Sequence, residues 1–164
     1  MVFDKWVTEI TNYSEKKRQI EAIGYARTHS SEEMIKVLCQ VAIETLDHEV
    51  RCAILDILKT KHLETASGIF AQYAKSGAER ERKWALVNLS MIECKTQRSI
   101  VLKGLKDPSA QVRRSAALNT GLYQDDDFLK EIITYFETNQ HDFLHELAFR
   151  ASERMIPAIR KKSK

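Results

Sequence analysis

The sequence predicts an all-α protein in which about five helical hairpins stack into a superhelix, and three observations lead to this prediction. Hydrophobic residues make up 43% of the 164 residues and charged residues 30%, which is the composition of a soluble globular domain. Only five Gly and two Pro residues occur, too few for the many tight turns of a β-sandwich. One helical pattern recurs along the chain, so the repeat itself indicates the architecture.

The recurring pattern is a turn, then an apolar and a basic residue, then a small residue. It is clearest in GLKDPSAQVRRSAAL, residues 104–118, where Val112 and Arg113 follow the turn and Ser115 is the small residue. Further copies are anchored at positions 19, 50, 82 and 143; Val50-Arg51 keeps the apolar and basic pair, Gln19-Ile20 and Arg82-Lys83 depart from it, and the copy at Phe143 is the weakest. The anchors therefore recur about every 31 residues, a period typical of repeats built from helix pairs.

A second helix pattern precedes each anchor, which gives ten helices in five hairpins. Its apolar residues recur at i, i+3, i+4 and i+7, the spacing of the buried face of a helix. The five sets are Phe3, Trp6, Val7 and Ile10; Ile35, Leu38, Val41 and Ala42; Leu63, Ala66, Ile69, Phe70 and Tyr73; Ile100, Val101 and Leu105; and Leu129, Ile132, Ile133 and Phe136.

Capping residues support these helix boundaries. Ser30 and Glu33 have the spacing of a capping box, and Pro108 with Ser109 suits the first turn of a helix. The run 125–127 places three Asp residues at another helix N-terminus, where negative charge is stabilising. We predict one domain over residues 1–164, with a basic tail at 158–164 and units at about 1–29, 30–60, 61–93, 94–123 and 124–159.

Positive charge is concentrated at the C-terminal end of the chain. The net charge is +3, with 26 basic and 23 acidic residues. Residues 154–164 contain no acid and five of the basic residues, so the remainder carries 21 − 23 = −2. The body of the chain is therefore not basic, which argues against a surface built mainly to bind phosphate.

The composition also bears on cellular location. No window reaches the roughly 18 uninterrupted apolar residues of a membrane span, and the first ten residues are too polar for a signal peptide. Cys39, Cys52 and Cys94 are widely spaced within apolar-periodic segments, which favours reduced core residues over a metal site. We expect a cytoplasmic protein that does not enter a membrane.

The segments LKDPSAQVRRSAAL and LDHEVRCAILDIL resemble HEAT repeats, in particular the short HEAT-like units of phycobilin lyases. The resemblance is strongest in the second and fourth units. It implies a structural ladder in which a turn acid and the Arg after the valine bond to neighbouring units. The third unit has no turn Asp and a Lys in place of Arg, so we expect an interruption there. By position, the ladder residues are Asp47, Arg51, Lys83, Asp107 and Arg113.

No pattern in the chain predicts a catalytic residue, a cofactor or a metal site. HEAT-like deoxyhypusine hydroxylases hold two irons with four His-Glu pairs, and only His48-Glu49 and His145-Glu146 resemble them. These two pairs lie about three repeats apart, too far to share a metal. His141 and His145 have the i, i+4 spacing of a zinc protease but lack a third ligand. We therefore predict a protein that is not an enzyme.

The second helices carry the best candidate for a binding surface. If Val50 and Ile54 face the core, the positions two and six after each anchor share another side of these helices. In HEAT superhelices the second helices line the concave face, and Trp, Tyr and Arg often dominate interfaces. The alternative, that Trp84 packs between neighbouring repeats, stays open. The predicted partner-binding groove consists of Tyr25, Trp84, Asn88, Arg114, Leu118 and Phe149.

Two functions are compatible with this architecture. The first is a non-enzymatic scaffold that binds a protein partner on the concave face. The alternative is a nucleic-acid-binding protein similar to HEAT-like alkylpurine DNA glycosylases, although the body charge of −2 opposes it. A third possibility, an accessory of an enzyme like the phycobilin lyase relatives, rests on the resemblance alone. The cations that favour nucleic-acid binding are Lys17, Arg18, Arg80, Arg82, Arg113 and Arg114.

Overall fold

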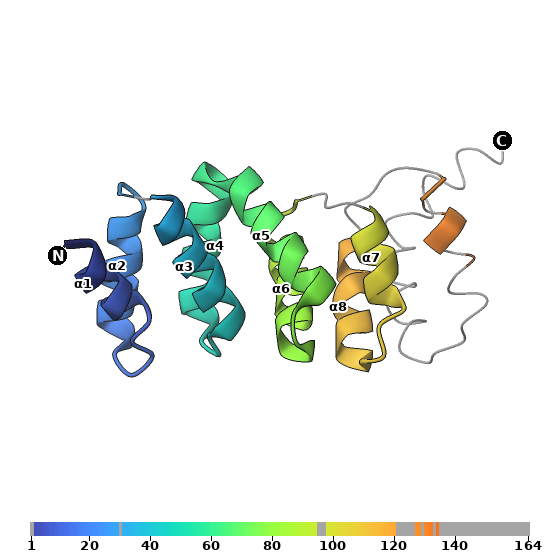
Figure 1. Ribbon diagram of the computed structural model, residues 1–164, viewed down its shortest axis with the longest axis horizontal. Coiled ribbons are helices and arrows are strands. Elements are labelled where there is room, and N and C mark those ends of the chain that lie inside the picture. The colour runs from blue at the N-terminus through green and yellow to red at the C-terminus, as the bar shows by residue number, and fades with distance from the viewer. Residues whose placement is uncertain are drawn as a thin grey trace.

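The computed structural model describes residues 2–29, 31–94, 98–120, 127, 128, 130–132 and 134, and all regular structure in these residues is α-helical. The prediction of an all-α protein is confirmed. Figure 1 shows successive helix pairs in a row along the long axis, in chain order from the N-terminus. They are α1 (Val2–Ile10), α2 (Lys16–Ala26), α3 (Glu32–Glu44), α4 (His48–Lys61), α5 (Leu63–Ser76), α6 (Glu79–Met91), α7 (Arg98–Leu105) and α8 (Ala110–Thr120).

The eight helices form four pairs, and each pair packs against the next. Within the pairs, α1 contacts α2, α3 contacts α4, α5 contacts α6, and α7 contacts α8. The first helices of the pairs also touch in sequence, from α1 through α3 and α5 to α7. Of the fifth predicted unit, only residues 127, 128, 130–132 and 134 are described; they are helical, with Phe128 and Ile132 buried.

A continuous apolar core runs through the row of helix pairs. It extends from Ile10 at the end of α1, through Phe70 in α5, to Ile132 beyond α8. One helix pair cannot bury its apolar face alone, so each pair depends on its neighbours for burial. The stacking of the pairs is therefore the main source of stability.

Side chains at the helix starts explain where several helices begin. Ser31 caps α3, because its Oγ accepts a hydrogen bond from the Met34 amide at 3.2 Å. The capping box was predicted one residue earlier, at Ser30, which lies outside the described residues. At the start of α6, the Glu81 carboxylate accepts the Ala78 amide at 2.6 Å. Ala78 has no side-chain acceptor to complete a capping box, so this helix start is capped from one side only.

The second helices of the pairs do not pack evenly. α6 packs closely against α8 and, on another side, against α3, whereas α4 and α6 make at most marginal backbone contact. The bulk of the side chains between them accounts for this difference. α6 presents Trp84 toward α4, whereas α8 carries Ser115 at the equivalent position, and a small residue lets two helices approach closely.

Candidate functional site

Each second helix carries one long polar side chain that reaches back to the turn before it. Each of these side chains belongs to the fourth residue of its helix, and the four recur about every 31 residues. The last carbonyl groups of a helix lack partners within it, and cations near them are stabilising. The bonds run from Gln19 Nε2 to the Ile10 oxygen at 2.7 Å, from Arg51 Nε to the Ala42 oxygen at 3.0 Å, from Arg82 Nη1 to the Gly77 oxygen at 3.0 Å, and from Arg113 Nη1 to the Asp107 oxygen at 2.8 Å.

In the third pair this position belongs to Arg82, not to Lys83, where the sequence placed it. The reason is that α6 starts after Ala78, so the fourth residue beyond is 82. Lys83 points instead along the row of helices, and its Nζ donates to Gln111 Oε1 on α8 at 2.9 Å. Sequence reasoning missed Arg82 here, although the 31-residue interval from Arg51 identifies it.

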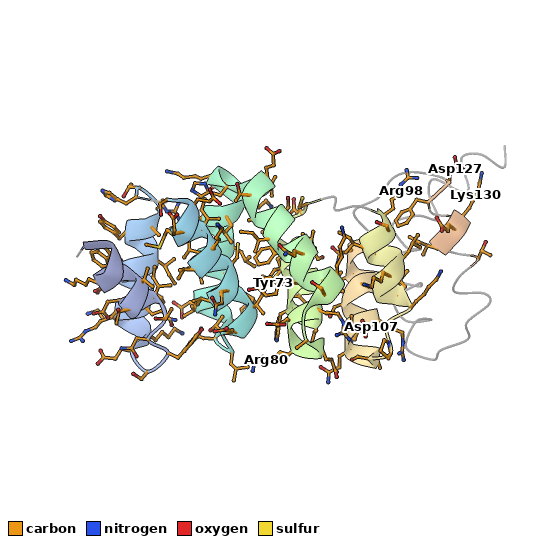
Figure 2. All side chains as sticks on the ribbon, viewed as in Figure 1. Tyr73, Arg80, Arg98, Asp107, Asp127 and Lys130 are labelled. Atoms are coloured by element: carbon orange, nitrogen blue, oxygen red, sulfur yellow. The ribbon has the colours of Figure 1, made fainter. Side chains whose placement is uncertain are left out.

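The expected interruption of the ladder at the third pair is not observed. Arg82 binds both carboxylate oxygens of Asp107, in the turn of the next pair, at 2.7 and 2.9 Å. The Asp107 side chain is only 8% exposed, and it also accepts the Ser109 amide at 2.9 Å. The hydrogen bonds from Arg82 are the main reason that the pKa of Asp107 lies below its ordinary value. Figure 2 shows Asp107 near the edge of the molecule that also carries Arg80.

Asp47, the other predicted turn acid, has two roles. Its Oδ1 accepts the amides of Glu49 and Val50 at 2.9 and 3.2 Å and so caps α4. Its Oδ2 lies 3.0 Å from Lys16 Nζ on the preceding pair. These contacts, led by the bond from Lys16, lower the pKa of Asp47. Asp47 and Asp107 therefore each connect one helix pair to the previous one.

Arg51 fills the space between α4 and α6 together with Trp84. The Arg51 side chain donates to the Ala42 and Thr45 carbonyl oxygens at the end of α3, and the residue is 3% exposed. Its guanidinium carbon lies 3.7 Å from the centre of the half-buried Trp84 ring, a cation–π contact. Burial is the main cause that lowers the pKa of Arg51. Trp84 therefore packs between repeats, the alternative that the sequence left open.

The predicted groove residues do not form one exposed surface. Tyr25 is half-buried and stacks on Trp6 and His29, with ring centroids 4.4 and 4.1 Å apart. Asn88 is 0% exposed, which contradicts its assignment to a binding surface. Among the five of them that the structure describes, only Arg114 and Leu118 are exposed, and Phe149 lies outside the described residues. The cause is the register of the pattern, because a shift of one residue in the first and third units moves a side chain by about 100° around its helix.

With the register corrected, a different set of residues lies on the exposed side of the last two second helices. Lys83 on α6 and Arg114 on α8 occupy equivalent positions, and Val87 and Leu118 follow them one turn later. Leu118 is 46% exposed, and Val87 is partly exposed without joining the apolar core. We call this surface the α6–α8 strip and define it as Lys83, Val87, Gln111, Arg114 and Leu118.

The α6–α8 strip contains two cations and no acid, and one carboxylate lies next to it: Glu79, one turn before Lys83 on α6, accepts the Ser109 hydroxyl at 2.7 Å. Among the described residues, the Lys83 ammonium donates a hydrogen bond to the neutral amide of Gln111, and none of the strip residues is acidic. Lys83 also lies 4.9 Å from the Trp84 ring. Within the described ranges, Arg114 has no hydrogen-bonding or ionic partner. Two cations therefore stand beside an exposed apolar pair.

The same side of α2 and α4 has a different charge pattern. Asp56 on α4 pairs with Arg27 on α2 at 2.6 Å, and Glu49 pairs with Lys16 at 2.6 Å. Cys52 stands at the α4 position that corresponds to Lys83 and Arg114. Positive and negative charges thus neutralise each other on this half of the face, whereas the two cations of the α6–α8 strip exceed the one carboxylate next to it, that of Glu79 on α6.

The two His-Glu pairs and the possibility of a metal site can be compared with the part of the chain that the structure describes. No group of three or more His, Cys, Asp and Glu side chains is placed to hold a metal ion among these residues. In the His48-Glu49 pair, His48 Nε2 lies 3.5 Å from Cys52 Sγ, whereas Glu49 binds Lys16. The two side chains therefore contact different residues. His141, His145 and Glu146 lie outside the described ranges. Among the described helices, none combines the length and apolar character needed to cross a membrane.

No family model matches the chain, and no curated protein matches it.

Proposed function

We propose that the chain is a non-enzymatic scaffold that binds a protein segment on the exposed side of its second helices. The observation that carries this proposal is the α6–α8 strip, where Val87 and Leu118 lie beside Lys83 and Arg114. Exposed apolar side chains next to an arginine are the combination that often dominates protein interfaces. The strip, and not the larger groove expected from the sequence, is the proposed site.

The proposed architecture is a HEAT-like superhelix, and the arrangement of the pairs supports it. First helices contact first helices along the row, and second helices contact second helices from α2 to α4 and from α6 to α8. The turn ladder recurs about every 31 residues, in all four described pairs. A repeating array of this type presents a long surface on one side, which suits an extended partner.

Nucleic-acid binding, the alternative function, has less support, because most of the cations it needs bond within the protein. A duplex is held by cations that are free to neutralise phosphates. Lys17 and Arg114 have no such bond among the described residues. The four cations with acceptors in the fold are Arg18, which pairs with Glu15; Arg80, which donates to the Glu44 oxygen; Arg82, which pairs with Asp107; and Arg113, which donates to the Asp107 and Pro108 oxygens.

Site-specific photocrosslinking tests the scaffold proposal. A photoreactive phenylalanine analogue replaces Leu118, and the protein is irradiated in native extract, once with and once without prior nuclease treatment. We expect a discrete covalent adduct with one protein, identified by mass spectrometry, because the side chain at 118 lies in the proposed contact. The matched control places the same analogue at Gln72, an exposed residue of the first helix α5.

Two results would contradict the proposal. The first is an equal yield of the same adduct from position 72, which would show that capture is not specific to the second-helix side. The second is an adduct that disappears on nuclease treatment, which would support nucleic-acid binding instead. Circular dichroism of both variants checks that the helices are retained.

A further inference from the structure

The charges of the α6–α8 strip also indicate the chemical class of segment that it could bind. We propose that its occupant is an acidic amphipathic segment, one that places carboxylates beside apolar side chains. This inference rests on the proposed function and adds the partner class. Its basis is charge complementarity, because Lys83 and Arg114 contribute two positive charges to the strip, whereas the adjacent carboxylate of Glu79 contributes one negative charge and accepts the Ser109 hydroxyl at 2.7 Å.

The layout of the strip defines two parallel rows. Lys83 and Arg114 form the first row, and Val87 and Leu118 form the second, four residues later on each helix. Four residues of helix correspond to about 6 Å, and packed helices lie about 8–10 Å apart. An amphipathic segment that lies across α6 and α8 can therefore place its acidic edge on the cations and its apolar side chains on the second row.

The two rows are held in place by the fold, which favours binding without rearrangement. α6 and α8 pack closely against each other. Asn119 strengthens this contact, because its Nδ2 donates across to the Leu86 oxygen at 2.9 Å. The Lys83 side chain is positioned by its bond to Gln111 on the other helix. A surface fixed in this way loses little conformational entropy when a partner binds.

A basic or uncharged segment fits the strip less well. A basic segment would face two like charges, and like charges across an interface oppose association. An uncharged segment would leave Lys83 and Arg114 covered without a partner, which costs free energy of desolvation. The strip therefore selects among segments mainly by charge, with the apolar row supplying burial.

Three synthetic peptides of equal length test the inference with the full chain. The first carries Glu on one helical face and Leu on the other, the second replaces each Glu by Lys, and the third replaces each Leu by Ala. Fluorescence anisotropy measures their Kd values. We expect the Glu/Leu peptide to bind at least about tenfold more tightly than either of the others.

Variants of the protein locate the binding. Arg114→Glu should weaken binding of the Glu/Leu peptide by about tenfold, since it replaces attraction by repulsion. Lys17→Glu makes the same charge change at an exposed position of α2, outside the strip, and should change the Kd less than about twofold. Equal losses from the two variants would overturn the inference, because they would indicate attraction to net charge alone.

The other peptide, DNA and crosslinking results separate a failure of the acidic partner class from a failure of the proposed function. Equal binding of the Glu/Leu and Lys/Leu peptides would overturn the acidic class, and tighter binding of a short DNA duplex would replace it by nucleic acid. If photocrosslinking at position 118 still captures a protein in the first case, the scaffold proposal stands while the acidic class fails. If crosslinking at 118 captures nothing, the proposed function itself fails.

Discussion

Two junctions between successive helix pairs use different physical solutions. Between α6 and α8 the second helices pack closely, with small residues between them. Between α4 and α6 the backbones stay apart, and Arg51 and Trp84 fill the space as a cation–π pair. The comparison shows that one repeat pattern can be stabilised either by close backbone approach or by two large side chains.

The two junctions also differ in the hydrogen bonding of a buried asparagine that occupies the same position in each. Asn119 on α8 donates to the Leu86 oxygen of α6 at 2.9 Å. Asn88 occupies the corresponding position on α6, and neither its amide nitrogen nor its oxygen has a partner. Both residues are 0% exposed. The amide nitrogen is therefore satisfied at the close junction, although the Asn119 oxygen has no partner there, and at the open junction both amide atoms are unsatisfied, where burial without a bond is costly.

The largest expected effect comes from separating the closely packed helices. A Cβ at Gly104 on α7 would lie 2.7 Å from the Ala116 Cβ and 3.2 Å from Leu86 Cδ1. We expect Gly104→Val to lower the free energy of unfolding by about 2–3 kcal/mol, because the helices must move apart. Chemical denaturation monitored by circular dichroism measures this change.

Gly68 on α5 supplies the control for this substitution. No atom lies within 4 Å of a Cβ built there, and the residue is also inside a helix. Gly68→Val should change the free energy of unfolding by less than about 0.5 kcal/mol, because valine and glycine differ little in helix propensity. Similar losses at both positions would show that close packing at Gly104 is not the cause.

The ion pair between Arg82 and Asp107 should make the stability of the junction between the third and fourth helix pairs depend on pH in acid. The pKa of folded Asp107 lies below its ordinary value of 3.8, so its bond to Arg82 stabilises the protein above that pH. This contribution is lost as the pH falls through the lower folded pKa. We expect Asp107→Asn to cost about 1.5–2 kcal/mol at pH 7, and the cost to shrink toward zero in acid.

An exposed ion pair provides the comparison for this prediction. Arg27 and Asp56 also connect two successive pairs, but both side chains are at least half exposed. Asp56→Asn should cost less than about 0.5 kcal/mol at pH 7. Denaturation curves at a series of pH values measure both variants. A cost for Asp107→Asn that does not fall in acid would show that the carboxylate charge is not what stabilises the junction.

The limits of sequence reasoning are clearest in α6. Apolar periodicity correctly predicted helix pairs, because the buried side of a helix determines its spacing. In the second and fourth units a valine before the arginine fixes the register. In the third unit Arg82 and Lys83 are both basic and Ala78 is a poor cap, so the local pattern allowed two registers. The wrong one placed Trp84 and Asn88 on an exposed groove.

The uneven junctions could not be predicted even with the correct register. Whether α4 approaches α6 depends on how Arg51 and Trp84 pack together, which is a property of two residues distant in sequence. The burial of Asn88 follows from that packing. The α6–α8 strip, by contrast, could have been found by stepping 31 residues from Arg114 to Lys83 and from Leu118 to Val87.

The smallest expected effects have opposite signs and test the comparison of the two asparagines directly. Leucine has a similar shape to asparagine but no hydrogen-bonding groups. Asn88→Leu should raise the free energy of unfolding by about 1 kcal/mol, because it removes an unsatisfied buried amide. Asn119→Leu should lower it by about 1 kcal/mol, because it removes the bond to the Leu86 oxygen.

The double variant completes this test. Asn88 and Asn119 lie in different junctions of α6, so their effects should add, and the double variant should have nearly the stability of the original protein. Chemical denaturation of the three variants measures this sum. A loss of stability in Asn88→Leu equal to that in Asn119→Leu would mean that both amides are satisfied in solution. The α4–α6 junction would then be as close as the α6–α8 junction.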